Sequence, residues 1–326
     1  MTERKPIRSL ELVESVLAGE VAAIARLLTR AEYGDEEVHD ALAEIYRHTG
    51  KAMVAGVTGV PGSGKSTLLQ RLVGAIRNTN RTVAVVAVDP TSPFSGGAIL
   101  GDRIRMHSFA NDPGVFIRSM ATRGALGGLA RATLDAVDIL DAAGFDVVLI
   151  ETVGVGQDEI DVVRAAHTIV VVSAPGLGDD IQAIKAGILE IADIHAVSKC
   201  DRKDANKTLA DLKNMLAIGA PSKQHSGWSL PVVATSALEG QGTEELLGHI
   251  DNHFAFLESS GELAARRWAI AEWRLLQTTE DLLRGEFVKH HDGRLSTFTR
   301  QLVSRETNPR AAAKELSDNV FKENQS

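Results

Sequence analysis

A glycine-rich segment near residue 60 has residue types and spacing that could bind phosphate groups. It reads Gly59-Val60-Pro61-Gly62-Ser63-Gly64-Lys65-Ser66-Thr67 and matches the pattern G-x-x-x-x-G-K-[ST] over its first eight positions. Glycines let backbone N–H groups turn toward phosphates, and the N-terminus of a following helix adds partial positive charge. The pattern predicts a nucleotide-binding loop in which Lys65 contacts the β- and γ-phosphates and Ser66 binds Mg²⁺.

Acidic residues follow two other apolar runs of the sequence. Asp89 ends the run 82–88, and Glu151 ends the run 147–150. In an open parallel sheet, ligands collect at the carboxyl ends of strands, so both acids are candidate ligands of Mg²⁺, directly or through water. The alternative is a carboxylate that caps the next loop. Asp102 lies in the glycine-rich stretch 95–103, which could become ordered around a γ-phosphate.

A short motif after the apolar run 194–197 could bind the base. It reads Ser198-Lys199-Cys200-Asp201 where GTPases usually have Asn-Lys-x-Asp. Asp201 can accept hydrogen bonds from the N1–H and the exocyclic amine of guanine, a pair that adenine does not offer. The Lys199 stem can lie over the base. Ser198 departs from the pattern, because a hydroxyl cannot make every contact of an asparagine amide.

A second base-contacting loop is expected further along the chain. Thr235-Ser236-Ala237-Leu238 follows the apolar residues 231–233 and resembles the final guanine-contacting loop of GTPases. Ser236, Ala237 and Leu238 are therefore candidate binding residues, with a backbone N–H meeting the base oxygen. The two loops together favour GTP over ATP.

The elements that must position these residues alternate between strand-like and helix-like patterns. The strand-like runs are Met53–Thr58, Thr82–Val88, Val115–Ile117, Val147–Glu151, Thr168–Val172, Ile194–Val197 and Pro231–Thr235. Nearly continuous apolar runs are typical of strands buried on both faces of a parallel sheet, and helical stretches between them indicate βαβ crossovers. We therefore expect an α/β fold of the P-loop NTPase class with a doubly wound, mostly parallel sheet.

Helical patterns flank this region on both sides. Apolar residues recur at helical spacing over residues 8–48 and again after about residue 260. The sequence thus predicts an N-terminal helical extension (1–50), a P-loop domain (51–258) and C-terminal helices with a tail (259–326).

Composition narrows the classes of partner and compartment. The formal net charge of −8 argues against a general binder of nucleic acid or anionic membrane, whose surface would be basic. A single cysteine excludes an internal disulfide framework and a cysteine-rich zinc site. No secretory signal or membrane-spanning run is recognised, so we expect a cytoplasmic protein with no membrane partner.

Taken together, the motifs closely resemble those of the MeaB/ArgK family, whose members are GTPase chaperones of adenosylcobalamin-dependent acyl-CoA mutases. The likeness extends from the N-terminal helices through at least residue 257. The motifs that carry it are Gly59–Ser66, Asp89-Pro90, Gly96-Gly97, Gly101-Asp102-Arg103, Gly127-Gly128, Glu151-Thr152-Val153-Gly154-Val155-Gly156-Gln157 and Gly178-Asp179-Asp180-Ile181-Gln182-Ala183-Ile184-Lys185.

The resemblance implies roles for several residues. Asp89 and Asp102 would belong to a first switch that organises the metal site. Glu151 and Gly154 would form the Walker B and second-switch segment. Residues 176–185 would form a third switch through which a partner stimulates hydrolysis. Its active members would be Gln182 and Lys185, although the residues alone favour a solvated helix lysine at position 185.

The resemblance also implies an activity and partners. The enzyme would hydrolyse GTP to GDP and phosphate, gate cofactor loading of a cobalamin-dependent mutase, and protect or reactivate it. The C-terminal helices would form the dimerisation arm of a homodimer. Two alternatives stay open: a kinase linked to amino-acid transport, although no H-R-D motif is present, and a metal-insertion GTPase, against which the single cysteine argues.

Overall fold

The computed structural model describes residues 8–89, 107–109, 111–121, 128–152, 165–176, 191–219, 227–289 and 294–323. Contacts within the chain divide it into two units, Met1–Ala271 and Glu272–Ser326. No described helix is both long enough and apolar enough to cross a membrane.

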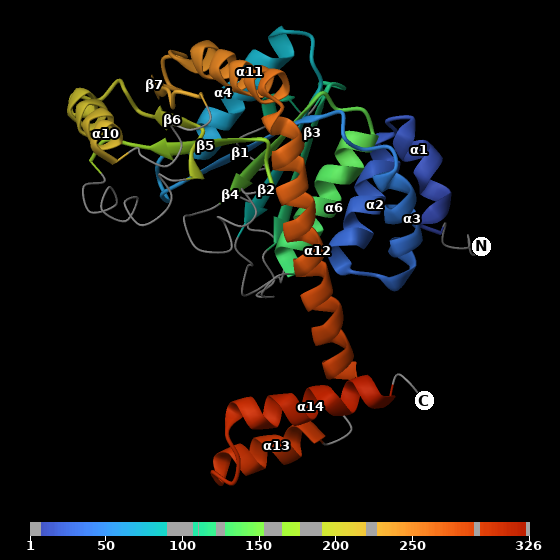
Figure 1. Cartoon of the computed structure of the whole chain (residues 1–326). Helices are drawn as coiled ribbons and strands as arrows, with labels where there is room; N and C mark the ends of the chain where they lie inside the picture. The colour runs from blue at the N-terminus through green and yellow to red at the C-terminus, as the bar shows by residue number, and fades with distance from the viewer. Residues whose placement is uncertain are drawn as a thin grey trace. The chain divides into compact units, whose positions relative to one another are not determined.

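The first unit contains a sheet of seven parallel strands in the order β3-β2-β4-β1-β5-β6-β7 (Figure 1). The strands are β1 (Met53–Gly59), β2 (Val83–Asp89), β3 (Val115–Ala121), β4 (Val147–Thr152), β5 (Thr168–Ser173), β6 (Ile194–Val197) and β7 (Val232–Ala234). Each overlaps one of the seven apolar runs, and the predicted parallel α/β fold is confirmed.

The strand order places β1 at the centre of the sheet, between β4 and β5. Chain connections run from β1 toward β2 and β3 on one side, and from β5 toward β6 and β7 on the other. Ligands of open α/β sheets bind where the direction of connection reverses, beyond the carboxyl ends of the strands. The loop that leaves β1 therefore occupies the position where a ligand is expected.

Alternation along the strands feeds two hydrophobic cores, one on each face of the sheet. Val54 and Ile150 pack in the first core, whereas Ala55 and Leu149 pack in the second. The first core is covered by α1 (Val13–Leu17), α2 (Val21–Tyr33), α3 (His39–Tyr46) and α6 (Gly128–Ala142). The second is covered by α4 (Lys65–Asn78) and α11 (Thr243–Ser260) (Figure 1).

A buried ionic cluster lies at the amino-terminal edge of the sheet, opposite the loop that leaves β1. Asp193, which is 3% exposed, binds both terminal nitrogens of Arg266 at 2.7 and 2.9 Å. The carboxylate also accepts the N–H of Ile169 at 2.8 Å, and its Oδ1 lies 3.6 Å from Nε2 of His253. Arg266 belongs to α12 (Glu262–Lys289), so the cluster fixes the first turns of this helix to the sheet.

The remaining long helices are α10 (Ala205–Gly219), α13 (Arg294–Val303) and α14 (Pro309–Glu323). In the second unit α13 packs against α14, and Ala312 is buried at 4% exposure. Helices α1, α2 and α3 lie within residues 8–48, and α12, α13 and α14 follow Gly261.

Candidate nucleotide-binding site

The loop between β1 and α4 has a backbone that only glycine can adopt at its two ends. Gly59 has φ 148°, and a Cβ there would lie 2.1 Å from the carbonyl oxygen of Val172. Gly64 has φ 89° and directly precedes α4. Because L side chains are strained at these angles, the first and third glycines of the motif are dictated by local geometry.

Lys65 begins α4, and its side chain turns back over the loop. Its ammonium nitrogen donates to the carbonyl oxygens of Gly59 at 2.8 Å and Val60 at 3.2 Å, and the residue is only 6% exposed. The backbone N–H groups of the first helical turn, including Ser66 and Thr67, have no partner within the helix. A cation and several N–H donors therefore gather at the carboxyl end of β1, which suits an anion.

Ser66, in the first turn of α4, contacts Glu151, which lies near the end of β4. The Ser66 hydroxyl donates to Glu151 Oε1 at 2.7 Å, and Glu151 is 4% exposed near the end of β4. Asp89 is the last residue of β2, next to β4, but its side chain is outside the described part of the chain. Asp102, Gly154, Gln182 and Lys185, all named from the sequence, also lie outside the described residues.

The Ser198–Asp201 motif lies beside the phosphate loop. The Ser198 hydroxyl contacts the carbonyl oxygens of Ser63 and, at 3.1 Å, Ser173. The ammonium of Lys199 donates to the carbonyl oxygen of Gly62 at 2.7 Å. Two successive side chains of this motif thus bind main-chain carbonyl groups. Lys199 binds a carbonyl of the phosphate loop, and Ser198 contacts one carbonyl of that loop and one at the end of β5.

The carboxylate of Asp201 is exposed and held from one side. The Ser236 hydroxyl donates to its Oδ1 at 2.7 Å. This hydrogen bond is the main reason that the pKa of Asp201 lies below its usual range. An ionised acceptor that is fixed on one side and open on the other can accept N–H groups from a base.

Arg71 of α4 holds the second base loop in place. Its Nε donates to the carbonyl oxygen of Ala237 at 2.7 Å, and its Nη2 lies 3.5 Å from that of Leu238. The Leu238 side chain is 79% exposed, so its binding role would be through the backbone. No local pattern in the sequence indicates this role for Arg71, because its partners lie more than 160 residues further along the chain.

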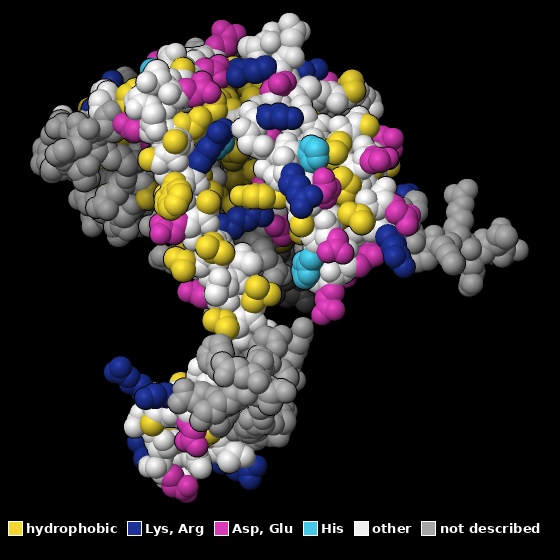
Figure 2. Space-filling view, turned by 45° about the vertical axis from the view of Figure 1, so that its right-hand side comes forward, with side chains coloured by type: hydrophobic (Ala, Val, Ile, Leu, Met, Phe, Trp, Pro, Cys, Tyr) yellow, Lys and Arg dark blue, Asp and Glu magenta, His cyan; other side chains and the backbone are white. Residues whose placement is uncertain are grey.

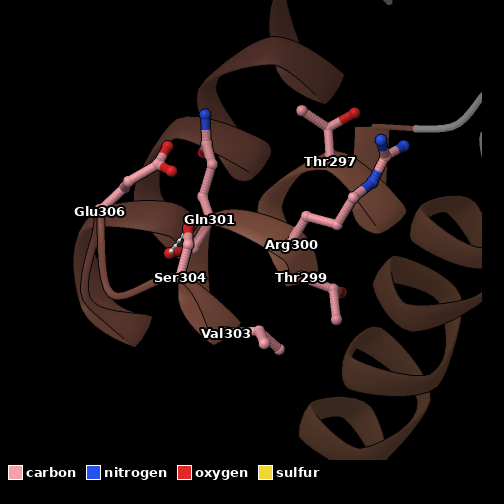
Figure 3. Close-up of a pocket in the computed structure, with 7 residues that line it drawn as sticks. All are labelled: Thr297, Thr299, Arg300, Gln301, Val303, Ser304 and Glu306. Atoms are coloured by element: carbon pink, nitrogen blue, oxygen red, sulfur yellow. Dashed lines mark hydrogen bonds between the residues drawn. The ribbon is translucent and has the colours of Figure 1, made fainter.

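A further hollow of about 470 Å³ lies in the second unit and does not resemble a catalytic site (Figure 3). Its lining residues come from α13 and the turn after it. The two charged ones, Arg300 and Glu306, point to different sides, and Val303 is 80% exposed. The residues that line the hollow are Thr297, Thr299, Arg300, Gln301, Val303, Ser304 and Glu306. Within the described residues, no group of three or more His, Cys, Asp or Glu side chains could hold a metal.

The glycine loop after a central parallel strand, with candidate base loops after β6 and β7, is typical of a P-loop nucleotide hydrolase. Residues 24–292 match the family model described as methylmalonyl Co-A mutase-associated GTPase MeaB, and the chain belongs to this family. The resemblance drawn from the motifs is thereby confirmed, and the chain is a GTP hydrolase.

Individual relatives support the same assignment. The chain is 45% identical over 314 residues to a Pyrococcus abyssi protein named as a GTPase, covering 96% of each. It is 35% identical over 317 residues to GTPase ArgK of Escherichia coli (strain K12), covering 94% of this chain and 95% of the relative. A crystal structure described as a LAO/AO transport system kinase superposes with a TM-score of 0.71 at 28% identity, covering 96% and 97% of the two chains.

Proposed function

We propose that this GTPase is a chaperone of an adenosylcobalamin-dependent acyl-CoA mutase, which gates cofactor loading and protects or reactivates the mutase. The observation that carries the proposal is the match of residues 24–292 to a family described as methylmalonyl Co-A mutase-associated. A mouse relative described as methylmalonic aciduria type A homolog, mitochondrial, supports it at 34% identity over 278 residues, 82% of this chain and 66% of the relative.

The phosphate loop supplies the binding half of the chemistry. In our proposal, Lys65, whose ammonium lies over the loop at the carbonyl groups of Gly59 and Val60, contacts the β- and γ-phosphates, while backbone N–H groups of residues 62–67 surround the β-phosphate. Lys199 and Asp201 contact guanine from the neighbouring loop, and a backbone N–H of Ala237 or Leu238 contacts its oxygen. Fixed donors around the phosphates stabilise the charge that develops as the γ-phosphate is transferred to water.

Mg²⁺ fits the oxygen pair at the carboxyl ends of β1 and β4. The Ser66 hydroxyl and the Glu151 carboxylate lie 2.7 Å apart, and both are hard oxygen donors of the kind that Mg²⁺ prefers. These two residues would hold the ion, with Asp89 and Asp102 as further proposed ligands. Bound there, it would neutralise charge on the phosphate oxygens.

Slow intrinsic turnover is part of the proposal. Among the described residues, the side-chain cations that hydrogen-bond the phosphate loop are Lys65 and Lys199, and no arginine joins them. An arginine at the transferred phosphate accelerates many GTPases strongly. We therefore assign stimulation to the mutase, acting through the segment that contains Gln182 and Lys185.

The test is GTP hydrolysis with and without purified cobalamin-dependent mutases. Slow turnover that one mutase accelerates, and that Lys65→Ala abolishes, is the expected result. Lys213→Ala removes a lysine exposed on α10 and is the matched control. GTP turnover indifferent to every mutase would refute the chaperone role. Phosphate transfer from nucleotide to a protein would instead favour a kinase, as the description of the structural relative suggests.

A homodimer belongs to the same proposal. Leu275, Leu276, Leu282 and Leu283 of α12 are exposed, and hydrophobic side chains along this helix are visible in Figure 2. Their seven-residue spacing is typical of helices that pair with copies of themselves. Leu275→Glu combined with Leu282→Glu should convert dimer to monomer in light scattering, whereas Arg284→Glu, at another exposed position of the helix, should not. A monomeric wild-type protein would refute this part.

A further inference from the structure

The side-chain hydroxyl of Ser198 hydrogen-bonds to main-chain carbonyl groups of the protein. The residue follows β6 and is 4% exposed. Its hydroxyl contacts two carbonyl oxygens, that of Ser63 on the phosphate loop and that of Ser173 at the end of β5. A serine hydroxyl has one proton, and a carbonyl oxygen can only accept. The single proton of Ser198 is therefore used within the protein.

Guanine offers only acceptors on the edge that carries N7 and O6. A hydroxyl whose proton is already donated cannot bind either atom, because its remaining lone pairs are acceptors too. An asparagine amide differs, because it has two N–H donors and a longer reach. One of these could bind the phosphate loop while the other binds N7. Replacing the usual asparagine by Ser198 removes that second donor.

The described side-chain hydrogen bonds of Lys199 and Asp201 are made to the phosphate loop and to Ser236. The ammonium of Lys199 lies on the carbonyl oxygen of Gly62 at 2.7 Å, and Asp201 is an acceptor held by Ser236. Asp201 can bind the N1–H and the exocyclic amine, which lie on the other edge of guanine. Ser198 and Lys199 instead fasten the base loop to neighbouring residues of the phosphate loop.

We infer that Ser198 is a positioning residue that couples the base loop to the phosphate loop, and that this GTPase binds guanine without a hydrogen bond to N7. Specificity then rests on the Asp201 edge of the base. The inference depends on the guanine-binding role proposed above for Lys199 and Asp201. It does not depend on the identity of any mutase, because it concerns the isolated chain.

The probe is 7-deaza-GDP, in which a C–H group replaces N7 and every other hydrogen-bonding group of the base is kept. Dissociation constants for GDP and 7-deaza-GDP should agree within about twofold for the wild-type protein. Inosine diphosphate, which lacks the exocyclic amine, should bind about 12- to 160-fold more weakly than GDP, the range expected for one hydrogen bond to a charged acceptor such as Asp201. This pattern would show that the Asp201 edge is read and that N7 is not.

Two substitutions test the role of Ser198. Ser198→Asn should create a preference for GDP over 7-deaza-GDP of about 2- to 12-fold, because the amide supplies the second donor. Ser198→Ala should weaken both nucleotides equally, because it removes only the tether to the phosphate loop. Ser198→Thr keeps the hydroxyl and should restore the binding lost in Ser198→Ala.

Two binding results would overturn the inference. A wild-type protein that binds 7-deaza-GDP more than about twofold more weakly than GDP, the low end of the range for one hydrogen bond, contains an N7 donor and overturns the inference. A Ser198→Asn variant that binds GDP but is indifferent to N7 overturns the assignment of that donor to position 198. Failure of the guanine site itself has a different signature, since ADP would then bind as tightly as GDP.

Discussion

Lowering the pH from 7 to 5 should destabilise the protein through two buried histidines. His167 immediately precedes β5 and His195 lies within β6, and both are almost fully buried. The pKa of each imidazole is lowered to about 4, chiefly by burial and, for His167, also by the nearby charges of Arg267 and Arg266. The His167 ring accepts the N–H of Val54 at 3.1 Å, which requires an unprotonated nitrogen.

The sign of the effect follows from proton binding. Histidine in the unfolded chain has a pKa near 6.5, so between pH 4 and 6.5 the unfolded state binds more protons than the folded state. The stabilisation is therefore complete above pH 6.5 and is lost as the pH falls through this window. Between pH 7 and pH 5 each histidine should lower the free energy of unfolding by about 2 kcal/mol. The sum, about 4 kcal/mol, is a large part of the roughly 5–15 kcal/mol of a typical domain.

Urea unfolding at pH 7 and pH 5, followed by tryptophan fluorescence, measures this loss. His195→Leu should remove about half of it and leave stability at pH 7 nearly unchanged, because neither ring nitrogen of His195 has a hydrogen-bond partner among the described residues. His39→Gln, at an exposed position, should leave the whole loss in place. An undiminished loss in His195→Leu, or equal wild-type stability at both pH values, would refute the reasoning.

Three further substitutions test the site and its support. Lys65→Ala should abolish GTP hydrolysis in a phosphate-release assay while leaving the melting temperature within a few degrees; retained turnover would remove Lys65 from the phosphate site. Arg71→Ala frees the loop at Ala237 and should raise the KM for GTP about fivefold, the value of one net hydrogen bond of about 1 kcal/mol; an unchanged KM would contradict its positioning role. Asp193→Ala leaves Arg266 without its buried partner and should lower the free energy of unfolding by about 3–5 kcal/mol in urea titrations. A loss below about 1 kcal/mol, the range of surface ion pairs, would show that solvent screens this cluster.

The positions of the strands were predictable because burial on both faces leaves a continuous apolar signature. The largest discrepancy is β3, which continues past its predicted end at Ile117 to Ala121. Arg118 and Ser119 interrupt the apolar run, yet the strand stays paired with β2. Arg118 is tolerated there because its guanidinium binds Glu32 of α2 at 2.5 Å. A partner from another helix cannot be read from a local hydrophobic pattern.

In the site as well, local motifs are predictable from the sequence, whereas contacts between segments far apart in the chain are not. The phosphate loop is a contiguous motif whose glycines are required by local backbone angles, so its location follows from the residues alone. The link from Arg71 to the loop at Ala237 joins α4 to a segment after β7 and has no local signal. At position 198 the sequence has serine where asparagine is usual. The fold shows in addition that the Ser198 hydroxyl contacts the carbonyl oxygens of Ser63 and Ser173.

The described contacts also indicate where a partner could act. The Ser236 hydroxyl holds Asp201, and Arg71 holds the loop at Ala237. Preorganised groups lose little conformational freedom on binding, so affinity for the nucleotide is largely a property of the isolated fold. Among the described residues, Lys65 and Lys199 hydrogen-bond carbonyl groups of the phosphate loop. If a mutase stimulates hydrolysis as proposed above, we expect kcat to change more than the KM for GTP.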